Sequence, residues 1–255
     1  MGHGGRPIEE HNGVRQIIDS WLYVDIPLMD YREAWGLQLA LVEARGRGDR
    51  IPDLVIMLEH PPVLTLGRRG TRENMREAEP FLRERGIPVF HVERGGDVTF
   101  HGPGQLVVYP VVDLRANGWK VVDFVGALEE VMIRIAGEWG IPSGRNALNR
   151  GVWAGMEKLG SVGIAVRRGI SFHGLALNVN TDLEPFGWIH PCGLREIRVS
   201  SMERLLGERI AMSRIRVAAR RHVHEVFNVT MEERTLQEIR LMVKKRTPRP
   251  REALP

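Results

Sequence analysis

A thiol and a primary amine are the side chains of this sequence best suited to group-transfer chemistry. Cys192 is the only cysteine and lies between a proline and a glycine, and Lys158 stands before a run of small residues at 160–163. A thiolate is a strong nucleophile, and a nearby ammonium favours it over the thiol. Taken singly, however, a lone cysteine is most often an inert buried residue and such a lysine a solvated loop residue.

The stretch R-G-G-D-V-T-F-H-G-P-G-Q-L-V-V-Y at residues 94–109 is the most distinctive part of the chain. Short, β-branched apolar runs at 87–90 and 106–112 border or overlap it and predict strands. Its glycines mark turns, let a ligand approach the main chain closely and leave N–H groups free. From composition alone, the stretch is equally a glycine-rich hairpin with Arg94 and His101 in solvent.

In its residue order this stretch resembles the signature of the octanoyl-[acyl-carrier-protein]:protein N-octanoyltransferases of lipoate assembly. Other stretches resemble the same family, namely E-H-P-P-V-L-T-L-G from residue 59, K-L-G-S-V-G from 158, H-G-L-A-L-N from 173 and P-C-G at 191–193. The resemblance covers residues 54–194. Gly160 and Val162 depart from the alanine and isoleucine usual in the family, and neither change removes a catalytic group.

The resemblance implies that Cys192 is the nucleophile and that Lys158 stabilises its thiolate and moves the proton. Backbone N–H groups of a turn at 161–163, or else of 192–193, would hold the oxyanion. His101 and His173 would position the thioester or bond to the backbone, and the sequence leaves both roles open. The residues implied to line the acyl pocket are Arg94, Gly95, Gly96, Asp97, Val98, Thr99, Phe100, His101, Ser161, Val162, Gly163, Gly174, Leu175 and Ala176.

The implied reaction transfers an octanoyl group from acyl-carrier protein to a specific lysine of a lipoyl domain, through an acyl-thioester on Cys192. This is the first step of endogenous protein lipoylation. The implied acceptors are the lipoyl domains of 2-oxoacid dehydrogenase E2 subunits and the glycine-cleavage H protein. No metal and no nucleotide cofactor is expected, because the acyl group arrives as a thioester on the phosphopantetheine of the carrier.

Two other functions compete with this interpretation. An ATP-dependent lipoate or biotin protein ligase on a related fold would form an acyl-adenylate and would use a lysine without needing Cys192. A nucleic-acid-binding module is suggested by the net charge of +4 and the isoelectric point near 9.6. The chain lacks helix-turn-helix, zinc-finger and RNP signatures, so we expect neither a nucleic-acid nor a membrane partner.

The bulk properties are those of a globular protein of a reducing compartment. The chain has 255 residues, of which 43% are apolar, enough for a sizeable core. A single cysteine excludes an intrachain disulfide. No apolar run approaches the ~20 residues of a membrane span, and the N-terminus has no apolar leader segment. We therefore expect a cytoplasmic protein.

The pattern of elements predicts an α/β (α+β) fold. We expect a single domain over residues 16–245, with a mixed β-sheet and surrounding helices like those of biotin and lipoate protein ligases. It would lie between a loose N-terminus at 1–15 and a disordered basic tail at 246–255. Expected strands are 17–24, 54–58 (buried on both faces), 63–66, 87–90, 106–112 and several within 151–180. Expected helices are 30–45, 73–85, one around 124–139, one around 215–227, and one capped by Thr230 and Glu233 that runs to about 245.

Overall fold

The computed structural model describes residues 19–77, 79–147, 149–189 and 198–244. The expected loose N-terminus and basic tail lie outside these residues. The strands are β1 Asp19–Ile26, β2 Leu54–Leu58, β3 Val63–Leu66, β4 Val89–His91, β5 Val98–His101, β6 Gln105–Val111, β7 Gly144–Asn146, β8 Asn149–Ala154, β9 Glu157–Arg167, β10 Ile170–Asn178, β11 Arg198–Val199 and β12 Val229–Glu233. The helices are α1 Tyr31–Gly46, α2 Glu79–Glu84, α3 Val121–Glu138, α4 Met202–Leu206, α5 Met212–Phe227 and α6 Leu236–Lys244, with 3₁₀ turns η1 Arg72–Asn74 and η2 Glu184–Trp188.

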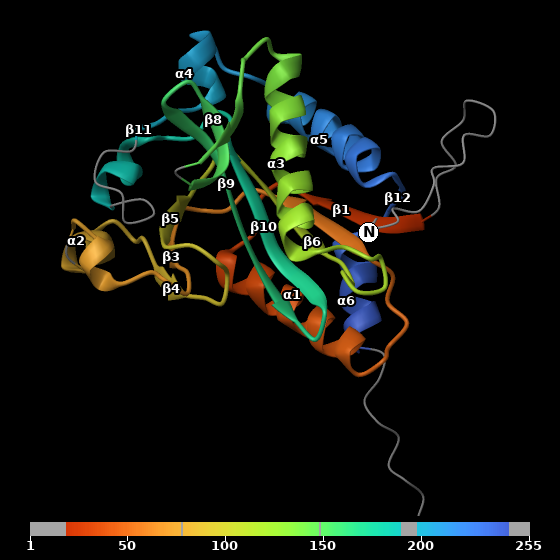
Figure 1. Ribbon diagram of the computed structural model, residues 1–255. Coiled ribbons are helices and arrows are strands. Elements are labelled where there is room, and N and C mark those ends of the chain that lie inside the picture. The colour runs from red at the N-terminus through yellow and green to blue at the C-terminus, as the bar shows by residue number, and fades with distance from the viewer. Residues whose placement is uncertain (1–18, 78, 148, 190–197, 245–255) are drawn as a thin grey trace, which may run out of the picture.

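Within these residues, nine strands form one large mixed sheet in the order β12-β1-β2-β6-β10-β9-β8-β7, and β11 pairs with β9. The β12, β1 and β2 strands are mutually parallel, whereas β2, β6, β10, β9 and β8 run antiparallel to one another in this order, and β11 is parallel to β9. Strands β4, β3 and β5 form a second, small sheet, which lies with α2 at the left of Figure 1. The fold is therefore the expected mixed sheet with surrounding helices.

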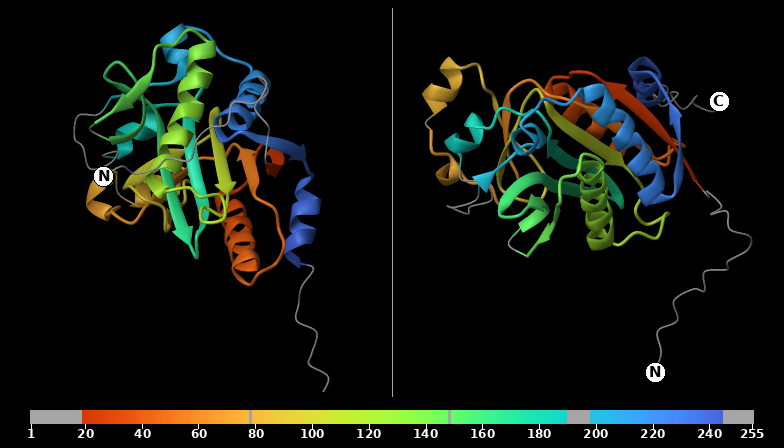
Figure 2. Two further views of the ribbon diagram at one scale, coloured as in Figure 1. Left: turned by 45° about the vertical axis from the view of Figure 1, so that its right-hand side comes forward. Right: turned by 90° about the horizontal axis from the view of Figure 1, so that it is seen from above.

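Helices cover both faces of the large sheet, with α3 in front of it and α1 behind it in Figure 1. Successive side chains of a strand point to opposite faces, and β1 shows this clearly. Trp21 and Tyr23 pack into the core that contains α3 and α5, whereas Leu22 and Val24 pack into the core that contains α1 and α6. The apolar run of β2 is completely buried for the same reason, which confirms the expectation for residues 54–58. Figure 2 shows these layers from two further sides.

The first helix begins where the sequence predicts it. The Asp30 side chain accepts hydrogen bonds from the N–H groups of Arg32 and Glu33, as an N-cap residue does. Trp35 and Leu39 of this helix are only half-buried. The residues of α1 that are buried are Tyr31, Ala34, Leu37, Gln38, Leu41, Val42 and Ala44.

Two helix predictions are wrong. The predicted helix 73–85 is replaced by the short turn η1 and the helix α2, separated by a bridge from Met75 to Ile189. Thr230 does not cap a helix, since it lies in β12 and pairs with Ser20 of β1. The last helix instead follows Thr235, whose N–H and hydroxyl both donate to the Glu238 carboxylate. No helix in the described part of the chain is both long and apolar enough to cross a membrane.

Candidate active site

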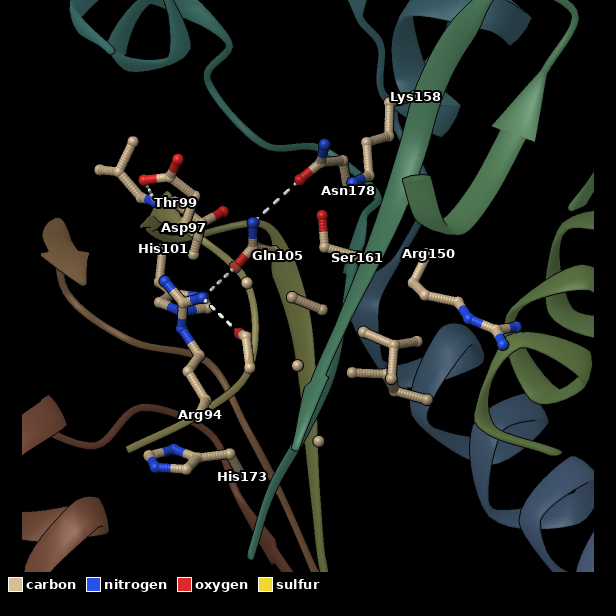
Figure 3. A pocket seen from close by; sticks show the side chains of 18 of the residues that line it. Arg94, Asp97, Thr99, His101, Gln105, Arg150, Lys158, Ser161, His173 and Asn178 are labelled. Atoms are coloured by element: carbon tan, nitrogen blue, oxygen red, sulfur yellow. Dashed lines mark hydrogen bonds between the residues drawn. The ribbon is translucent and has the colours of Figure 1, made fainter. Parts of the chain in front are cut away.

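A pocket lies where β5 of the small sheet faces β9 and β10 of the large sheet (Figure 3). Its volume is about 60 Å³, several times the ~10–15 Å³ that one water molecule requires. Lys158 and His173 stand at opposite ends of the labelled side chains in Figure 3, and Arg94 and His101 lie between them. The pocket therefore has one end beside Lys158 and another beside His173.

The sequence-predicted acyl-contacting residues gather at this pocket. Every one of them lines it except Phe100. Phe100 is buried in the apolar cluster of the small sheet with Leu64 and Leu82, and its ring packs edge-on against Phe186 at 5.7 Å. Its side chain points away because its neighbours Thr99 and His101 face the pocket and side chains alternate along a strand. The prediction that Phe100 lines the pocket is therefore wrong, although its strand β5 borders the pocket.

Lys158 is a buried residue of β9 that lines the pocket. Its relative exposure is 3%, so the solvated-loop interpretation is wrong. Its Nζ donates to Asn149 Oδ1 at 3.2 Å and lies 5.8 Å from the centre of the Trp153 ring. Gly151 leaves room for the lysine stem, because a Cβ there would lie 3.0 Å from Lys158 Cε. The amine is thus held at one place on the pocket wall.

Cys192 lies outside the described residues. The segment that contains it is bounded by described residues of the pocket on both sides. Phe186 precedes it and Val199 follows it, and both line the pocket. The N–H groups of 192–193, the second choice for the oxyanion, lie in the same segment.

A chain of hydrogen bonds connects His101 with the strand that carries Lys158. Gln105 Oε1 accepts from His101 Nδ1 at 2.7 Å, and Gln105 Nε2 donates to Asn178 Oδ1 at 2.9 Å (Figure 3). Asn178 Nδ2 donates to the Ser200 carbonyl at 3.1 Å, and the Ser200 N–H donates to the Lys158 carbonyl at 2.9 Å. Because the amide accepts from Nδ1, that nitrogen carries the proton and Nε2 of His101 is left as an acceptor.

Arg94 is buried rather than solvated. Its Nε and one terminal nitrogen donate to Thr65 Oγ1 at 3.2 and 2.8 Å, and the same terminal nitrogen donates to the Thr65 carbonyl at 2.7 Å. Its stem lies against Gly163, where a Cβ would be 3.3 Å from Arg94 Cδ. The relative exposures of Arg94 and His101 are 8% and 6%, so the solvated hairpin interpretation is wrong for both.

The E-H-P-P stretch supports the turn that follows His101. Glu59 Oε2 accepts from the Gly104 N–H at 2.7 Å, and Glu59 Oε1 forms a 2.9 Å ion pair with Arg216 of α5. Gly104 has φ of 80°, and a Cβ there would lie 2.4 Å from the Asn180 carbonyl oxygen. Only glycine fits such a position without strain. This contact joins the two sequence stretches in space.

Residues 161–163 form part of β9 and not a turn, so that prediction is wrong. They pair with β10 in the register Ser161↔Ala176, Val162↔Leu175 and Gly163↔Gly174. Their role toward an oxyanion remains a prediction. At the neighbouring Gly160, a Cβ would lie 2.6 Å from Met132 Sδ. The glycine that departs from the family pattern is therefore matched to a buried methionine of α3.

Burial keeps the pocket histidines neutral. It lowers the pKa of His101 well below its ordinary value, with a smaller contribution from nearby His60, and it also lowers the pKa of His173. The carboxylate of Glu93 lies 3.7 Å from His173 Nε2, which is beyond hydrogen-bond length. The nearby His173 ring and the Trp35 indole N–H, which donates to this carboxylate at 3.1 Å, lower the pKa of Glu93 to about 2.

Several pocket residues were missed by sequence reasoning. Gln105 and Asn178 stand inside the quoted motif stretches, so their place in the motifs was a usable signal. Tyr31 and Asn149 lie outside the motifs, and no local pattern distinguishes them. Lys158 and His173, which were both named from the sequence, also line the pocket, and the other lining residues are Tyr109, Arg150, Phe186 and Val199. Among the described residues, no group of three or more His, Cys, Asp or Glu side chains is arranged to hold a metal ion.

Comparison with known proteins agrees with the sequence resemblance. Residues 30–224 match the family model described as the lipoyl protein ligase A/B catalytic domain. The octanoyltransferase of Syntrophobacter fumaroxidans is 46% identical over 220 residues, which cover 86% of this chain and 96% of that protein. The octanoyltransferase of Desulfotalea psychrophila is 47% identical over 186 residues, which cover 72% of this chain and 83% of that protein.

Solved structures agree on the fold. A crystal structure of lipoate-protein ligase A bound with ATP superposes with a TM-score of 0.69 at 18% identity, covering 89% of this chain and 94% of that one. A putative lipoate protein ligase from T. acidophilum superposes with a TM-score of 0.67 at 17% identity, covering 89% of this chain and 94% of that one. At such identities the likeness concerns the fold alone, and it confirms the predicted lipoate-ligase-like fold. By the family model and by its relatives, the chain belongs to the lipoyl protein ligase A/B catalytic-domain family, in its octanoyltransferase branch.

Proposed function

We propose that this chain transfers an octanoyl group from octanoyl-acyl-carrier protein to a specific lysine of lipoyl domains, through an acyl-thioester on Cys192. The acceptors are the E2 subunits of 2-oxoacid dehydrogenases and the glycine-cleavage H protein. The observation that carries the proposal is the buried Lys158 amine on the wall of a pocket lined by the predicted acyl-contacting residues. The names of the relatives at 46% and 47% identity support the transferred group.

Chain length supports the pairing of Cys192 with Lys158. Phe186 and Val199 line the same pocket as Lys158, and Cys192 is separated from each by only a few residues. At about 3.3–3.6 Å per extended residue, the six residues from Phe186 to Cys192 (192 − 186) are long enough for the thiol to reach the pocket wall. An ammonium close to a thiol favours the thiolate, and the thiolate is the reactive form.

The first half-reaction acylates the enzyme. The Cys192 thiolate attacks the carbonyl carbon of the donor thioester, and the bond from that carbon to the carrier sulfur breaks. The departing carrier thiolate takes a proton from Lys158. In the second half, the acceptor lysine amine attacks the acyl-Cys192 thioester and gives a proton to Lys158, and the Cys192 thiolate leaves. The amide forms with no net change in the enzyme.

This chemistry requires neither a metal nor a nucleotide, since the donor thioester is already activated. The competing reaction is ATP-dependent ligation, which is suggested by the fold shared with a lipoate-protein ligase solved with ATP. The two reactions differ in their donor. A ligase would use free octanoate or lipoate and ATP, whereas the proposed transferase uses octanoyl-carrier protein alone.

Intact mass spectrometry tests the proposal. The protein is incubated with octanoyl-carrier protein, with and without ATP, and then with a lipoyl domain. We expect an octanoyl adduct on Cys192 that hydroxylamine removes, followed by octanoylated lipoyl domain, in both the presence and the absence of ATP. Turnover at the wild-type rate by Cys192→Ser, or a strict requirement for ATP, would rule out this mechanism.

A further inference from the structure

The end of the pocket away from Lys158 is lined by hydrogen-bonding side chains. His173 is at this end in Figure 3, with the stem of Arg94 next to it. The Tyr31 ring stacks on His101 at 5.9 Å, and the Tyr109 ring meets His173 edge-on at 6.2 Å. All of them line the pocket. An octanoyl chain that has its carbonyl beside Lys158 would direct its methyl end toward this polar surface.

Three buried polar atoms here have no hydrogen-bond partner among the described residues. They are Tyr31 Oη and both ring nitrogens of His173. Tyr31 is 2% exposed and His173 is 1% exposed, and the closest carboxylate oxygen, on Glu93, is 3.7 Å from His173. Buried polar atoms without partners are rare and destabilising, so each calls for a water molecule or a ligand atom. The methyl end of an octanoyl chain supplies neither a donor nor an acceptor.

The charges around this end select the kind of polar group that it can hold. Glu93 beside His173 opposes a second carboxylate, and the Arg94 guanidinium opposes an ammonium. A neutral imidazole has one donor and one acceptor nitrogen, and a phenol hydroxyl both donates and accepts. The group that matches Tyr31 and His173 is therefore an uncharged one that also donates and accepts, such as a hydroxyl.

We propose that this pocket accepts medium-chain acyl groups with a hydroxyl on or next to their ω-carbon, and that Tyr31 and His173 bind this hydroxyl. The inference rests on the proposed function, because it places the acyl carbonyl beside Lys158. Tyr31 and His173 then act as specificity-determining residues at the far end of the chain. Transfer of plain octanoyl does not depend on them as hydrogen-bonding partners.

The experiment compares octanoyl-carrier protein with 8-hydroxyoctanoyl-carrier protein as donors, with acylated lipoyl domain measured by intact mass. We expect the wild-type kcat/KM for the two donors to agree within about threefold, whereas an unpaired buried hydroxyl would slow transfer by roughly 5- to 150-fold. Tyr31→Phe removes only one oxygen and should lower the ratio of hydroxyoctanoyl to octanoyl kcat/KM by roughly 5- to 10-fold. His173→Phe should lower the same ratio.

The ratio within one variant cancels any general loss of activity. Tyr23→Phe is the matched control, because Tyr23 is a buried tyrosine of β1 that does not line the pocket. It should keep the wild-type ratio. If the wild-type protein transfers octanoyl efficiently but transfers 8-hydroxyoctanoyl more than 50-fold more slowly, this inference is overturned and the proposed function stays intact. A ratio unchanged in both Tyr31→Phe and His173→Phe would mean that water alone occupies the site, which also overturns it. Failure of both donors would overturn the proposed function itself.

Discussion

Lys158 Nζ donates a hydrogen bond to Asn149 Oδ1 at 3.2 Å, across the antiparallel pair formed by β8 and β9. Asn149 is the first residue of β8 and lines the pocket together with the lysine. A neutral acceptor of this kind orients the amine without neutralising its charge. The amine is therefore oriented while it keeps its charge, and under the proposed function Asn149 is a positioning residue for Lys158.

Removal of the Asn149 amide should slow acyl transfer. We expect Asn149→Ala to lower kcat/KM roughly tenfold, because one hydrogen bond that orients the amine is lost. Asn149→Asp keeps the acceptor but adds a negative charge, which favours the protonated amine. The Asn149→Asp variant should therefore transfer the acyl group slowly at neutral pH, and its rate should recover as the pH rises. Substitution of a purely structural residue would not produce this pH profile. Asn117→Ala is the control, since Asn117 binds Asp53 and the Asp113 carbonyl away from the pocket.

Two substitutions of Lys158 separate its proposed roles. Cys192 is the only cysteine, so the rate of iodoacetamide alkylation reports on its thiolate alone. Lys158→Ala should slow alkylation at neutral pH, and the difference should shrink as the pH passes the raised thiol pKa. Lys158→Arg keeps a positive charge but does not readily release a proton. It should retain much of the alkylation rate and lose acyl transfer.

The opposite result for Lys158 is equally clear. If Lys158→Ala changes neither the pH profile of alkylation nor the rate of transfer, the lysine has no part in the chemistry. The base would then be sought at His101, whose Nε2 is left as an acceptor by the bond from Nδ1 to Gln105.

Gly151 sets the space available to the lysine stem. It has φ of 128°, and a Cβ would lie 2.2 Å from the Gly160 carbonyl oxygen and 3.0 Å from Lys158 Cε. We expect Gly151→Ala to reduce the free energy of unfolding by about 2–4 kcal/mol and to lower kcat, because backbone strain and overlap act together. Gly144→Ala is the matched control, since a Cβ there meets nothing within 4 Å. Urea unfolding and single-turnover rates measure the two effects, and equal behaviour of both variants would contradict the steric argument.

The sequence predicts best those elements whose signal is local. The run of β2 is apolar throughout because both of its faces are covered by helices, and the motif stretches mark the pocket because glycine is required where main chains meet. The C-terminal region shows where this reasoning fails. Thr230 and Glu233 have the same spacing as Thr235 and Glu238, so both pairs resemble a helix start. Only the pairing of β12 with β1, which is remote in sequence, decides between them.

Local sequence signals also fail to identify some of the residues that line the pocket. Tyr31 opens a helix and Asn149 opens a strand, and neither lies in one of the motif stretches. They reach the pocket because α1 and β8 are brought there by tertiary packing. The direction of Phe100 is also a tertiary result, since the side of β5 that faces the pocket depends on how the small sheet docks. Residue type predicted which stretches gather at the site, and packing decided which side chains enter it.

The buried histidines predict a dependence of stability on pH. Burial lowers the pKa of His60 to about 4 and that of His101 well below its ordinary value of 6.5, so both are neutral in the folded protein near pH 6. In the unfolded chain each titrates near 6.5. As the pH falls below that value the unfolded state binds protons that the folded state does not, and stability declines. The contribution of these residues is complete above about pH 7.5 and is lost progressively toward acid.

We expect the free energy of unfolding, measured in urea between pH 7.5 and 5.5, to fall by up to about 1.4 kcal/mol per pH unit for each such histidine at the acid end. His60→Asn retains an N–H donor toward the Met29 carbonyl, which His60 Nδ1 contacts at 2.7 Å, but cannot titrate. It should lower stability at pH 7.5 and give a shallower slope toward acid. His91→Gln, at an exposed position of β4, should keep the wild-type slope. A slope that His60→Asn leaves unchanged would show that His60 is not neutral in the folded protein, or that it stays buried and neutral in the unfolded chain as well.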